Sequence, residues 1–312
     1  MKLAFLYAGQ GSQKVGMGKD LYDNNETFKT VIDKVDTVVD IDLKTLMFEG
    51  PMEDLSQTKF TQPCMAAYAA GVTKVLKESG IKPEYVAGLS LGEYSALNCA
   101  EVFDEETLVK MVAFRGNAME EAAKGIECKM SAVMGLDSDS LDKICEDICN
   151  ENNGYVTVSN YNCTGQYVVC GDMSVVDKAE AMAKEAGAKR CMPLKVSGPF
   201  HTKFMNPAAE ALEKYFADIE FNAMKYPVIF NTTASELQDN ENIKDILVKQ
   251  VANSIYMEKT IKYLESKGVD TVIEIGPGKA LSGFIKRTAE NMQTYAIESI
   301  DDLNKVIELF GK

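Results

Sequence analysis

Hydrophobic and polar positions follow two recurring patterns along the chain. Short apolar runs, such as residues 2–7 and 85–89, are bounded by glycine or polar residues, as expected of buried strands. Longer segments repeat apolar residues every three or four positions, which is typical of amphipathic helices. Because the two kinds of segment alternate, we predict an α/β fold with a mostly parallel sheet covered by helices on both faces.

The longest helix-like segment runs from residue 62 to residue 79. Pro63 would lie in its first turn and Gly80 just past its end, positions that these residue types favour. A second amphipathic segment, residues 104–124, lies downstream of the apolar run at 85–89. The remaining predictions are short helices between 20 and 59, helices at 206–217, 242–253 and 259–267 and near 279, and strands at 228–230 and 269–275.

Residues 127–195 have a rhythm of their own. Their order is strand, helix, strand, strand, helix, strand, which is the ferredoxin-like split unit. We predict an inserted subdomain at 127–195 within an α/β core formed by 1–126 and 196–312. Its predicted strands are 129–136, 155–160, 166–170 and 188–194, its helices are 138–150 and 174–186, and residues 161–165 are predicted to link the two middle strands.

Composition narrows the classes of function. The 312 residues carry 33 Lys and Arg against 47 Asp and Glu, a net charge of −14, and at most two basic residues are consecutive, which argues against nucleic-acid binding. No apolar run suits a membrane span, and the N-terminal run leads into Gly-Gln-Gly rather than a signal-peptide cleavage site. The eight cysteines form no C-x-x-C pair, so we interpret them as small apolar side chains in a reducing cytoplasm.

Ser90 is the centre of a G-x-S-x-G sequence between a strand-like run and a helix-like pattern. Such a strand–turn–helix arrangement is a nucleophile elbow, in which Gly88 and Gly92 leave room for the tight turn. The motif alone also occurs in ordinary turns, but its placement favours a nucleophile. The amides after the serine, starting with that of Leu91, point out of the helix N-terminus and suit an oxyanion.

The chain has one histidine, His201, which follows Gly198 and Pro199. A serine nucleophile needs a base at neutral pH, and histidine is the usual one. A lone histidine is also compatible with a surface position or a satisfied core position. Because loops rich in chain-breaking residues commonly carry function, we predict that His201 is the base.

Two further residues are candidates from their surroundings. Arg115 lies between Phe114 and Gly116 in a predicted helix, where an inward and a solvated side chain are both compatible with the pattern. Gln10 lies between two glycines, so a substrate can approach its backbone closely. Its loop lacks the third glycine of a dinucleotide motif and the G-K-[ST] of a P-loop.

Six short motifs occur along the chain in a fixed order. They are Gly9-Gln10-Gly11-Ser12-Gln13, Gly88-Leu89-Ser90-Leu91-Gly92-Glu93, Arg115-Gly116, Pro199-Phe200-His201, Gln250-Val251 and Glu274-Ile275-Gly276-Pro277-Gly278. In this order and spacing the chain resembles the malonyl-CoA:acyl-carrier-protein transacylases over residues 2–300. The resemblance implies a hydrolase-like α/β core with an inserted ferredoxin-like subdomain.

The resemblance also implies a role for each matching residue. Ser90 would be the nucleophile that becomes malonylated, and His201 its base and later the acid for the leaving thiol. The backbone carbonyl of Gln250 would orient the histidine. Arg115 would bind the free malonyl carboxylate, a pairing that suits a planar guanidinium. The backbone amides of Gln10 and Leu91 would form the oxyanion hole, and Asn160 would lie near the acyl group.

The implied reaction moves malonyl from malonyl-CoA to the phosphopantetheine thiol of acyl carrier protein through a malonyl-serine, in a ping-pong scheme without metal or bound cofactor. Phe200 is bulky where an α-branch would sit, so we predict malonyl over methylmalonyl. The expected pathway is fatty acid synthesis. A polyketide or polyunsaturated-lipid synthase and a serine thioesterase remain alternatives. A non-catalytic scaffold in a synthase complex would predict loss of Ser90 or His201.

Acyl carrier proteins are usually acidic, as is this chain, so a local basic rim is expected to bind the carrier. A monomer is the default expectation. Two departures from the family pattern are Leu89, where histidine is frequent, and Ala8, where proline is frequent. The candidate basic residues are Lys189, Arg190, Lys195, Lys203, Lys286 and Arg287.

Overall fold

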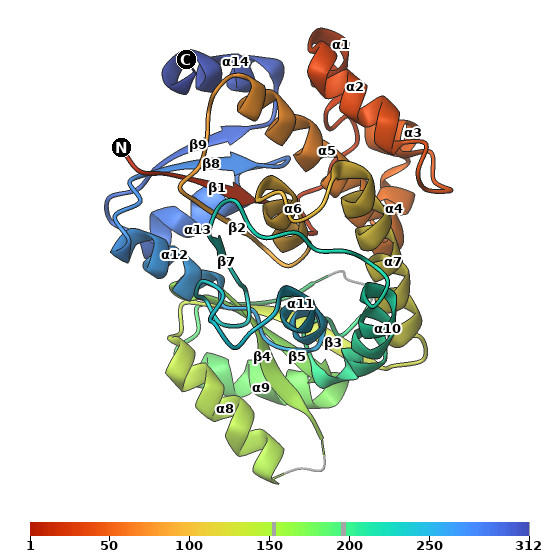
Figure 1. The fold of residues 1–312 in the computed structure, drawn as a ribbon. Coiled ribbons are helices and arrows are strands. Elements are labelled where there is room, and N and C mark those ends of the chain that lie inside the picture. Colours follow the sequence, from red (N-terminus) through yellow and green to blue (C-terminus); the bar gives the residue numbers. More distant parts are fainter. Residues whose placement is uncertain (152–153, 195–197, 312) are drawn as a thin grey trace.

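The computed structural model describes residues 1–151, 154–194 and 198–311, and two sheets organise them (Figure 1). The first sheet has the strand order β7-β2-β1-β8-β9, and all its neighbouring strands are parallel. The predicted α/β class with a parallel sheet is therefore confirmed. The strands are β1 (Leu3–Tyr7), β2 (Tyr85–Gly88), β7 (Val228–Ile229), β8 (Thr271–Ile275) and β9 (Gln293–Ile297).

Helices cover both faces of this sheet. Successive side chains of a strand point to opposite faces, and in β1 Leu3, Phe5 and Tyr7 join one core cluster while Ala4 and Leu6 join another. The first cluster includes α5, and the second includes α12 and α13. The helices of this part are α1 (Lys19–Asn24), α2 (Glu26–Val35), α3 (Leu43–Phe48), α4 (Met52–Leu55), α5 (Thr58–Glu78), α6 (Leu91–Cys99), α7 (Glu105–Ala123), α10 (Asn206–Phe216), α11 (Ile243–Ala252), α12 (Met257–Ser266), α13 (Ala280–Thr288) and α14 (Ile300–Phe310), with a short 3-10 helix at Lys203–Met205.

The second sheet is antiparallel, with the order β4-β5-β3-β6, and lies with its two helices at the lower end of Figure 1. This is the predicted βαββαβ arrangement. One face packs on α8 and α9 through residues such as Val133 and Val169, whereas Met130 and Val168 on the other face join the main core. The boundaries 127–195 stay a prediction. The elements are β3 (Cys128–Met134), α8 (Ser138–Glu151), β4 (Val156–Cys163), β5 (Gln166–Asp172), α9 (Met173–Glu185) and β6 (Arg190–Pro193).

Three details differ from the sequence-based expectations. The predicted link 161–165 is mostly strand, because β4 continues to Cys163, where Tyr161 and Cys163 pair with Tyr167 and Gln166 of β5. Helix α5 begins at Thr58, so Pro63 lies inside the helix rather than in its first turn. Strand β9 and helix α14 were not predicted. In β9 only Ile297 is fully buried, so this edge strand lacks a clear hydrophobic pattern.

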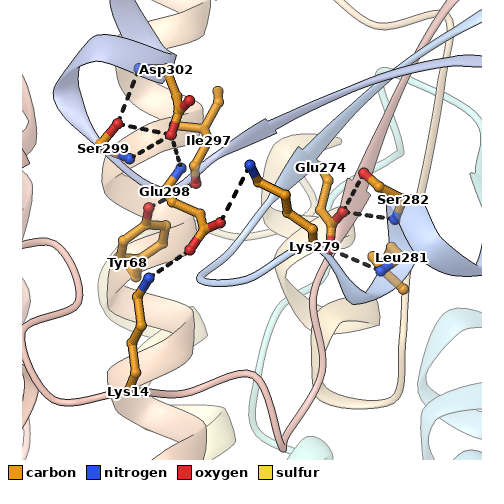
Figure 2. Close-up of polar contacts among 10 residues, drawn as sticks. All are labelled: Lys14, Tyr68, Glu274, Lys279, Leu281, Ser282, Ile297, Glu298, Ser299 and Asp302. Atoms are coloured by element: carbon orange, nitrogen blue, oxygen red, sulfur yellow. Dashed lines mark hydrogen bonds and ion pairs between the residues drawn. The ribbon is translucent and has the colours of Figure 1, made fainter.

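Ion pairs and hydrogen bonds connect the loops at the carboxyl ends of β1, β8 and β9, as Figure 2 shows. Glu298, which follows β9, lies 2.5 Å from the Nζ of Lys14 and 3.9 Å from that of Lys279. The buried Glu274 of β8 accepts hydrogen bonds from the backbone N–H groups of Leu281 (2.9 Å) and Ser282 (2.8 Å). These contacts fix the start of α13 and the segment that follows the Gln10 loop.

The structure describes the cysteines, the possible metal ligands and the long helices of the chain. All eight cysteines are free, and five of them are buried. Within residues 1–151, 154–194 and 198–311, no group of three His, Cys, Asp or Glu side chains is arranged to hold a metal ion. Over the same residues, no helix has the length and apolar character needed to cross a membrane.

Candidate active site

Ser90 occupies the sharp turn between β2 and α6. Its backbone angles, φ 55° and ψ −105°, are unusual for a residue with a side chain and indicate local strain. A Cβ on Gly88 would lie 2.1 Å from the backbone of Gly92, and a Cβ on Gly92 would lie 2.3 Å from the carbonyl oxygen of Tyr7. Both positions therefore require glycine, and the turn has the form of a nucleophile elbow.

His201 meets Ser90 from a loop 111 residues away in sequence. The Nε2 of His201 lies 2.7 Å from the Oγ of Ser90, and its Nδ1 lies 2.9 Å from the backbone oxygen of Gln250. A carbonyl oxygen only accepts, so Nδ1 carries the hydrogen and Nε2 of the neutral ring accepts the serine hydroxyl. The sequence left a surface and a core position open, and the structure places this side chain in the cavity with Ser90.

The environment keeps the imidazole of His201 neutral. The ring is 4% exposed, and burial lowers its pKa from 6.5 to about 4, with a further contribution from the positive charge of Arg115. A hydrogen bond to Gln250 acts in the opposite direction but is weaker. At neutral pH the ring is therefore free to accept a proton.

Arg115 points inward, which resolves the alternative that the sequence left open. The side chain is 1% exposed and its guanidinium lies over the ring of Tyr94, 5.3 Å from the centroid. One terminal nitrogen donates to Gln62 Oε1 (2.9 Å), and the other donates to Ser90 Oγ (3.0 Å) and Gln250 Oε1 (2.9 Å). All three acceptors are neutral, so the buried positive charge has no anionic partner among these contacts.

These side chains open into one cavity of about 250 Å³. Hollows of about 340 Å³ around Lys74 and about 460 Å³ around Tyr215 are larger, but neither contains a nucleophile beside a base. Seven of the eight predicted site residues line the cavity, the exception being Gln250. They are Gln10, Ser90, Leu91, Arg115, Asn160, Phe200 and His201, and the apolar part of the wall is formed by Leu89, Met119, Met130, Val168, Leu194, Ala280 and Phe284.

Gln10 and Leu91 both line the cavity. The Gln10 side chain donates to Thr58 Oγ1 (3.0 Å), and a Cβ on the adjacent Gly9 would lie 2.6 Å from the carbonyl oxygen of Leu89. Neither the backbone N–H of Gln10 nor that of Leu91 donates to an acceptor within the part of the chain that the structure describes. Both amides are therefore available to a bound group.

Asn160, a residue of strand β4, also lines the cavity. Its Oδ1 accepts a hydrogen bond from Ser159 Oγ (2.7 Å). This bond does not use the NH₂ group of Asn160, which can donate to a bound molecule. Asn162, two positions along the strand, also lines the cavity, and its buried Oδ1 has no partner among the described residues. The spacing of two places both side chains on the same face of the strand.

Sequence reasoning missed three polar residues at this site. Gln62 holds the guanidinium of Arg115, and Asn162 faces the cavity. Asn231 accepts a hydrogen bond from the backbone N–H of Ser90 at 2.7 Å. The one available signal was that Asn231 comes just after a predicted strand, because such residues gather at the carboxyl edge of a parallel sheet.

The candidate basic rim is not tested by the structure. Arg287 donates to Gln166 Oε1 (2.6 Å) and the Nζ of Lys203 lies 4.0 Å from the ring centroid of Tyr155. Lys195 lies outside the described residues. The rim stays a prediction.

Comparison with known proteins extends over nearly the whole chain. A model of the acyl transferase domain matches residues 4–305. The chain is 39% identical over 307 residues to the malonyl CoA-acyl carrier protein transacylase of Bacillus subtilis, covering 98% of this chain and 96% of that protein. An acyl carrier protein S-malonyltransferase structure from Vibrio cholerae superposes with a TM-score of 0.94 at 38% identity, covering 98% of this chain and 100% of that chain. A malonyl-transacylase solved in complex with a type II polyketide acyl carrier protein gives a TM-score of 0.95 at 35% identity, over 99% and 100% of the two chains.

Proposed function

The chain belongs to the acyl transferase domain family, and from this premise we propose that it transfers malonyl from malonyl-CoA to the phosphopantetheine thiol of an acyl carrier protein. One observation carries the proposal. The hydroxyl of Ser90, the imidazole of His201 and the guanidinium of Arg115 converge within hydrogen-bond distance in one cavity. A nucleophile, a base and a carboxylate receptor are the three groups that the reaction needs.

In the first half-reaction, Ser90 Oγ attacks the thioester carbonyl of malonyl-CoA while its proton passes to His201 Nε2. The carbonyl oxygen becomes an oxyanion, which the backbone amides of Gln10 and Leu91 stabilise. The tetrahedral intermediate then collapses, the C–S bond breaks, and His201 gives its proton to the departing coenzyme A thiolate. The backbone carbonyl of Gln250 holds the imidazole in the required tautomer throughout.

In the second half-reaction, His201 removes the proton from the phosphopantetheine thiol, and the sulfur attacks the malonyl-serine ester. Ser90 leaves and takes the proton back. Each half exchanges one acyl bond for another, so the scheme is ping-pong and consumes no cofactor. Water has to be kept from the ester, and the mostly apolar wall of the cavity serves this purpose.

Arg115 selects the acyl group. In the free protein its partners are neutral, and a malonyl carboxylate supplies the missing anion in a bidentate pairing. An acetyl group leaves the buried guanidinium without such a partner. Phe200, buried beside the base, restricts a branch next to the thioester carbon.

The identity of the acyl carrier protein that receives the malonyl group determines whether the product enters fatty acid or polyketide synthesis. Relatives named malonyl CoA-acyl carrier protein transacylase favour fatty acid synthesis. A second candidate is malonyl supply to a polyketide synthase, which the similarity to a transacylase bound to a type II polyketide carrier favours. A cytoplasmic location and a monomeric state remain predictions.

Intact-mass spectrometry after mixing with malonyl-CoA tests the proposal. We expect one malonyl adduct on the wild type, none on Ser90→Ala, and transfer of the adduct to added holo acyl carrier protein faster than its loss to water. An adduct that only hydrolyses would identify a thioesterase. An unlabelled wild type would refute the proposal.

A further inference from the structure

The strained backbone of Ser90 is held by a side chain from a different strand. The N–H of Ser90 donates to Asn231 Oδ1 at 2.7 Å, and Asn231 Nδ2 donates to the carbonyl oxygen of Gly88 at 2.6 Å. The side-chain amide of Asn231 therefore forms hydrogen bonds with the backbone on both sides of Leu89, at Gly88 and at Ser90. Asn231 is 1% exposed and lies 141 residues from Ser90, just after β7.

The backbone of Asn231 is itself fixed from both directions. Its N–H donates to Glu93 Oε2 at 2.5 Å, and its carbonyl oxygen accepts from the N–H of Tyr256 at 2.9 Å. Glu93 is fully buried and belongs to the first turn of α6, the helix that begins directly after Ser90. The contacts thus form a closed circuit from Ser90 to Asn231, to Glu93, and along α6 back to Ser90.

Asn231 and Glu93 are buried polar residues, and packing of apolar side chains does not require a polar group at either position. Asparagine carries a donor and an acceptor on one planar group, and the turn uses both, so neither aspartate nor an apolar residue reproduces the contacts. Glu93 is a buried carboxyl whose Oε1 has no hydrogen-bond partner in the described chain. Burial raises the pKa of Glu93 to about 8, against smaller opposing effects of the Asn231 N–H and the charge of Arg115. Arg115, Tyr94 and the amide of Gln250 are the charged, titratable and polar side chains that face it.

We propose that Asn231 and Glu93 are a positioning pair for the acyl transfer reaction: the Asn231 side chain sets the backbone of Ser90, and Glu93 sets Asn231. The nucleophile is then held at hydrogen-bond distance from His201 before substrate binds. The Leu91 amide follows in the chain and is oriented by the same turn. Loss of the pair lets the turn relax, and small displacements of reacting atoms reduce rates on the order of 100-fold. This inference rests on the proposed function where it names malonyl-CoA as the substrate. The test of serine reactivity does not depend on that function.

The test measures two rates for each variant: malonylation of Ser90 by malonyl-CoA, and labelling of Ser90 by phenylmethanesulfonyl fluoride, a small electrophile without a carboxylate. We expect Asn231→Ala to lower both rates on the order of 100-fold while KM for malonyl-CoA changes little. Glu93→Ala should follow it, and Glu93→Gln should restore both rates at pH 7, because its amide oxygen still accepts from Asn231. Asn98→Ala is the matched control, since Asn98 is a buried asparagine of α6 that donates to the carbonyl of Phe103 (2.9 Å), away from the turn.

Each outcome has a defined meaning. The positioning role would be overturned if Asn231→Ala reacted at the wild-type rates. It would also be overturned if Asn98→Ala lost as much of both rates as Asn231→Ala. Equal losses in Glu93→Gln and Glu93→Ala would overturn the role of Glu93. Should Asn231→Ala not fold, Asn231→Asp replaces it; it keeps the shape and the acceptor but loses the donor to Gly88, and the same loss is expected. A wild type that reacts with the sulfonyl fluoride but not with malonyl-CoA would refute the proposed function and leave the positioning pair intact.

Discussion

Replacing Arg115 with glutamine should remove the preference for a carboxylated acyl group. In the free protein the guanidinium contacts neutral acceptors, on Gln62, Gln250 and Ser90, so its charge is left to be matched by substrate. A malonyl carboxylate would make two charge-assisted hydrogen bonds, each worth about 1.5–3 kcal/mol. Glutamine keeps one weaker donor, so we expect a net loss of about 3 kcal/mol, which corresponds to on the order of 100-fold in rate.

The same substitution should change how the reaction depends on pH. The charge of Arg115 helps to lower the pKa of His201 to about 4, and the base is active only when neutral. Loading by the wild type should therefore persist as pH falls and be lost only near pH 4. In Arg115→Gln the cation is absent, so the pKa of His201 rises and loading of Ser90 is lost at a higher pH than in the wild type.

Both effects can be read from quenched-flow loading of Ser90 with malonyl-CoA and acetyl-CoA across pH, followed by intact mass. Malonyl loading at pH 7 should fall on the order of 100-fold, while acetyl loading changes little. Lys110→Gln is the control, because it removes an exposed cation from the same helix. An unchanged ratio of malonyl to acetyl loading in Arg115→Gln would refute the reasoning, as would an acid limb identical to that of the wild type.

Three further predictions concern the acyl pocket, the buried carboxyl and the carrier. Phe200→Ala should admit methylmalonyl-CoA in competition with malonyl-CoA, and equal labelling by both esters in the wild type would contradict the role of Phe200. Glu93 has a folded pKa of about 8 against 4.5 for the free group, so its contribution to stability is present at low pH and is lost as pH rises between these values. Chemical denaturation should accordingly show Glu93→Gln losing less stability than the wild type from pH 5 to pH 8, by a few kcal/mol, and parallel curves would be inconsistent with a buried, protonated carboxyl. Charge reversal of Lys286 and Arg287 together should raise KM for the acyl carrier protein without altering serine loading, whereas an equal fall in loading would argue against a docking rim.

Local sequence determined much of this protein. The two glycines around Ser90, the apolar runs of the strands and the helix periodicity each act over a few residues, so they predicted the elbow, the parallel sheet and the βαββαβ unit. The residues around them made His201, Arg115 and Gln10 candidates, and the family resemblance then added Gln250 and Asn160 and gave each residue a role. Local pattern was insufficient at two elements: β4 continues to Cys163 through its pairing with β5, and the edge strand β9 lacks a distinct hydrophobic pattern.

Tertiary structure alone decided which way the polar side chains point. The local sequence around Arg115 is compatible with a solvated and with a buried side chain. Only the tertiary structure shows that Gln62 of α5 and Gln250 of α11 accept hydrogen bonds from its guanidinium. Asn231 reaches Ser90 across 141 residues, and no spacing rule connects them. Hydrogen bonds between residues far apart in sequence depend on the relative positions of whole helices and strands. The burial of apolar surface over the whole chain sets these positions, and no local sequence pattern does.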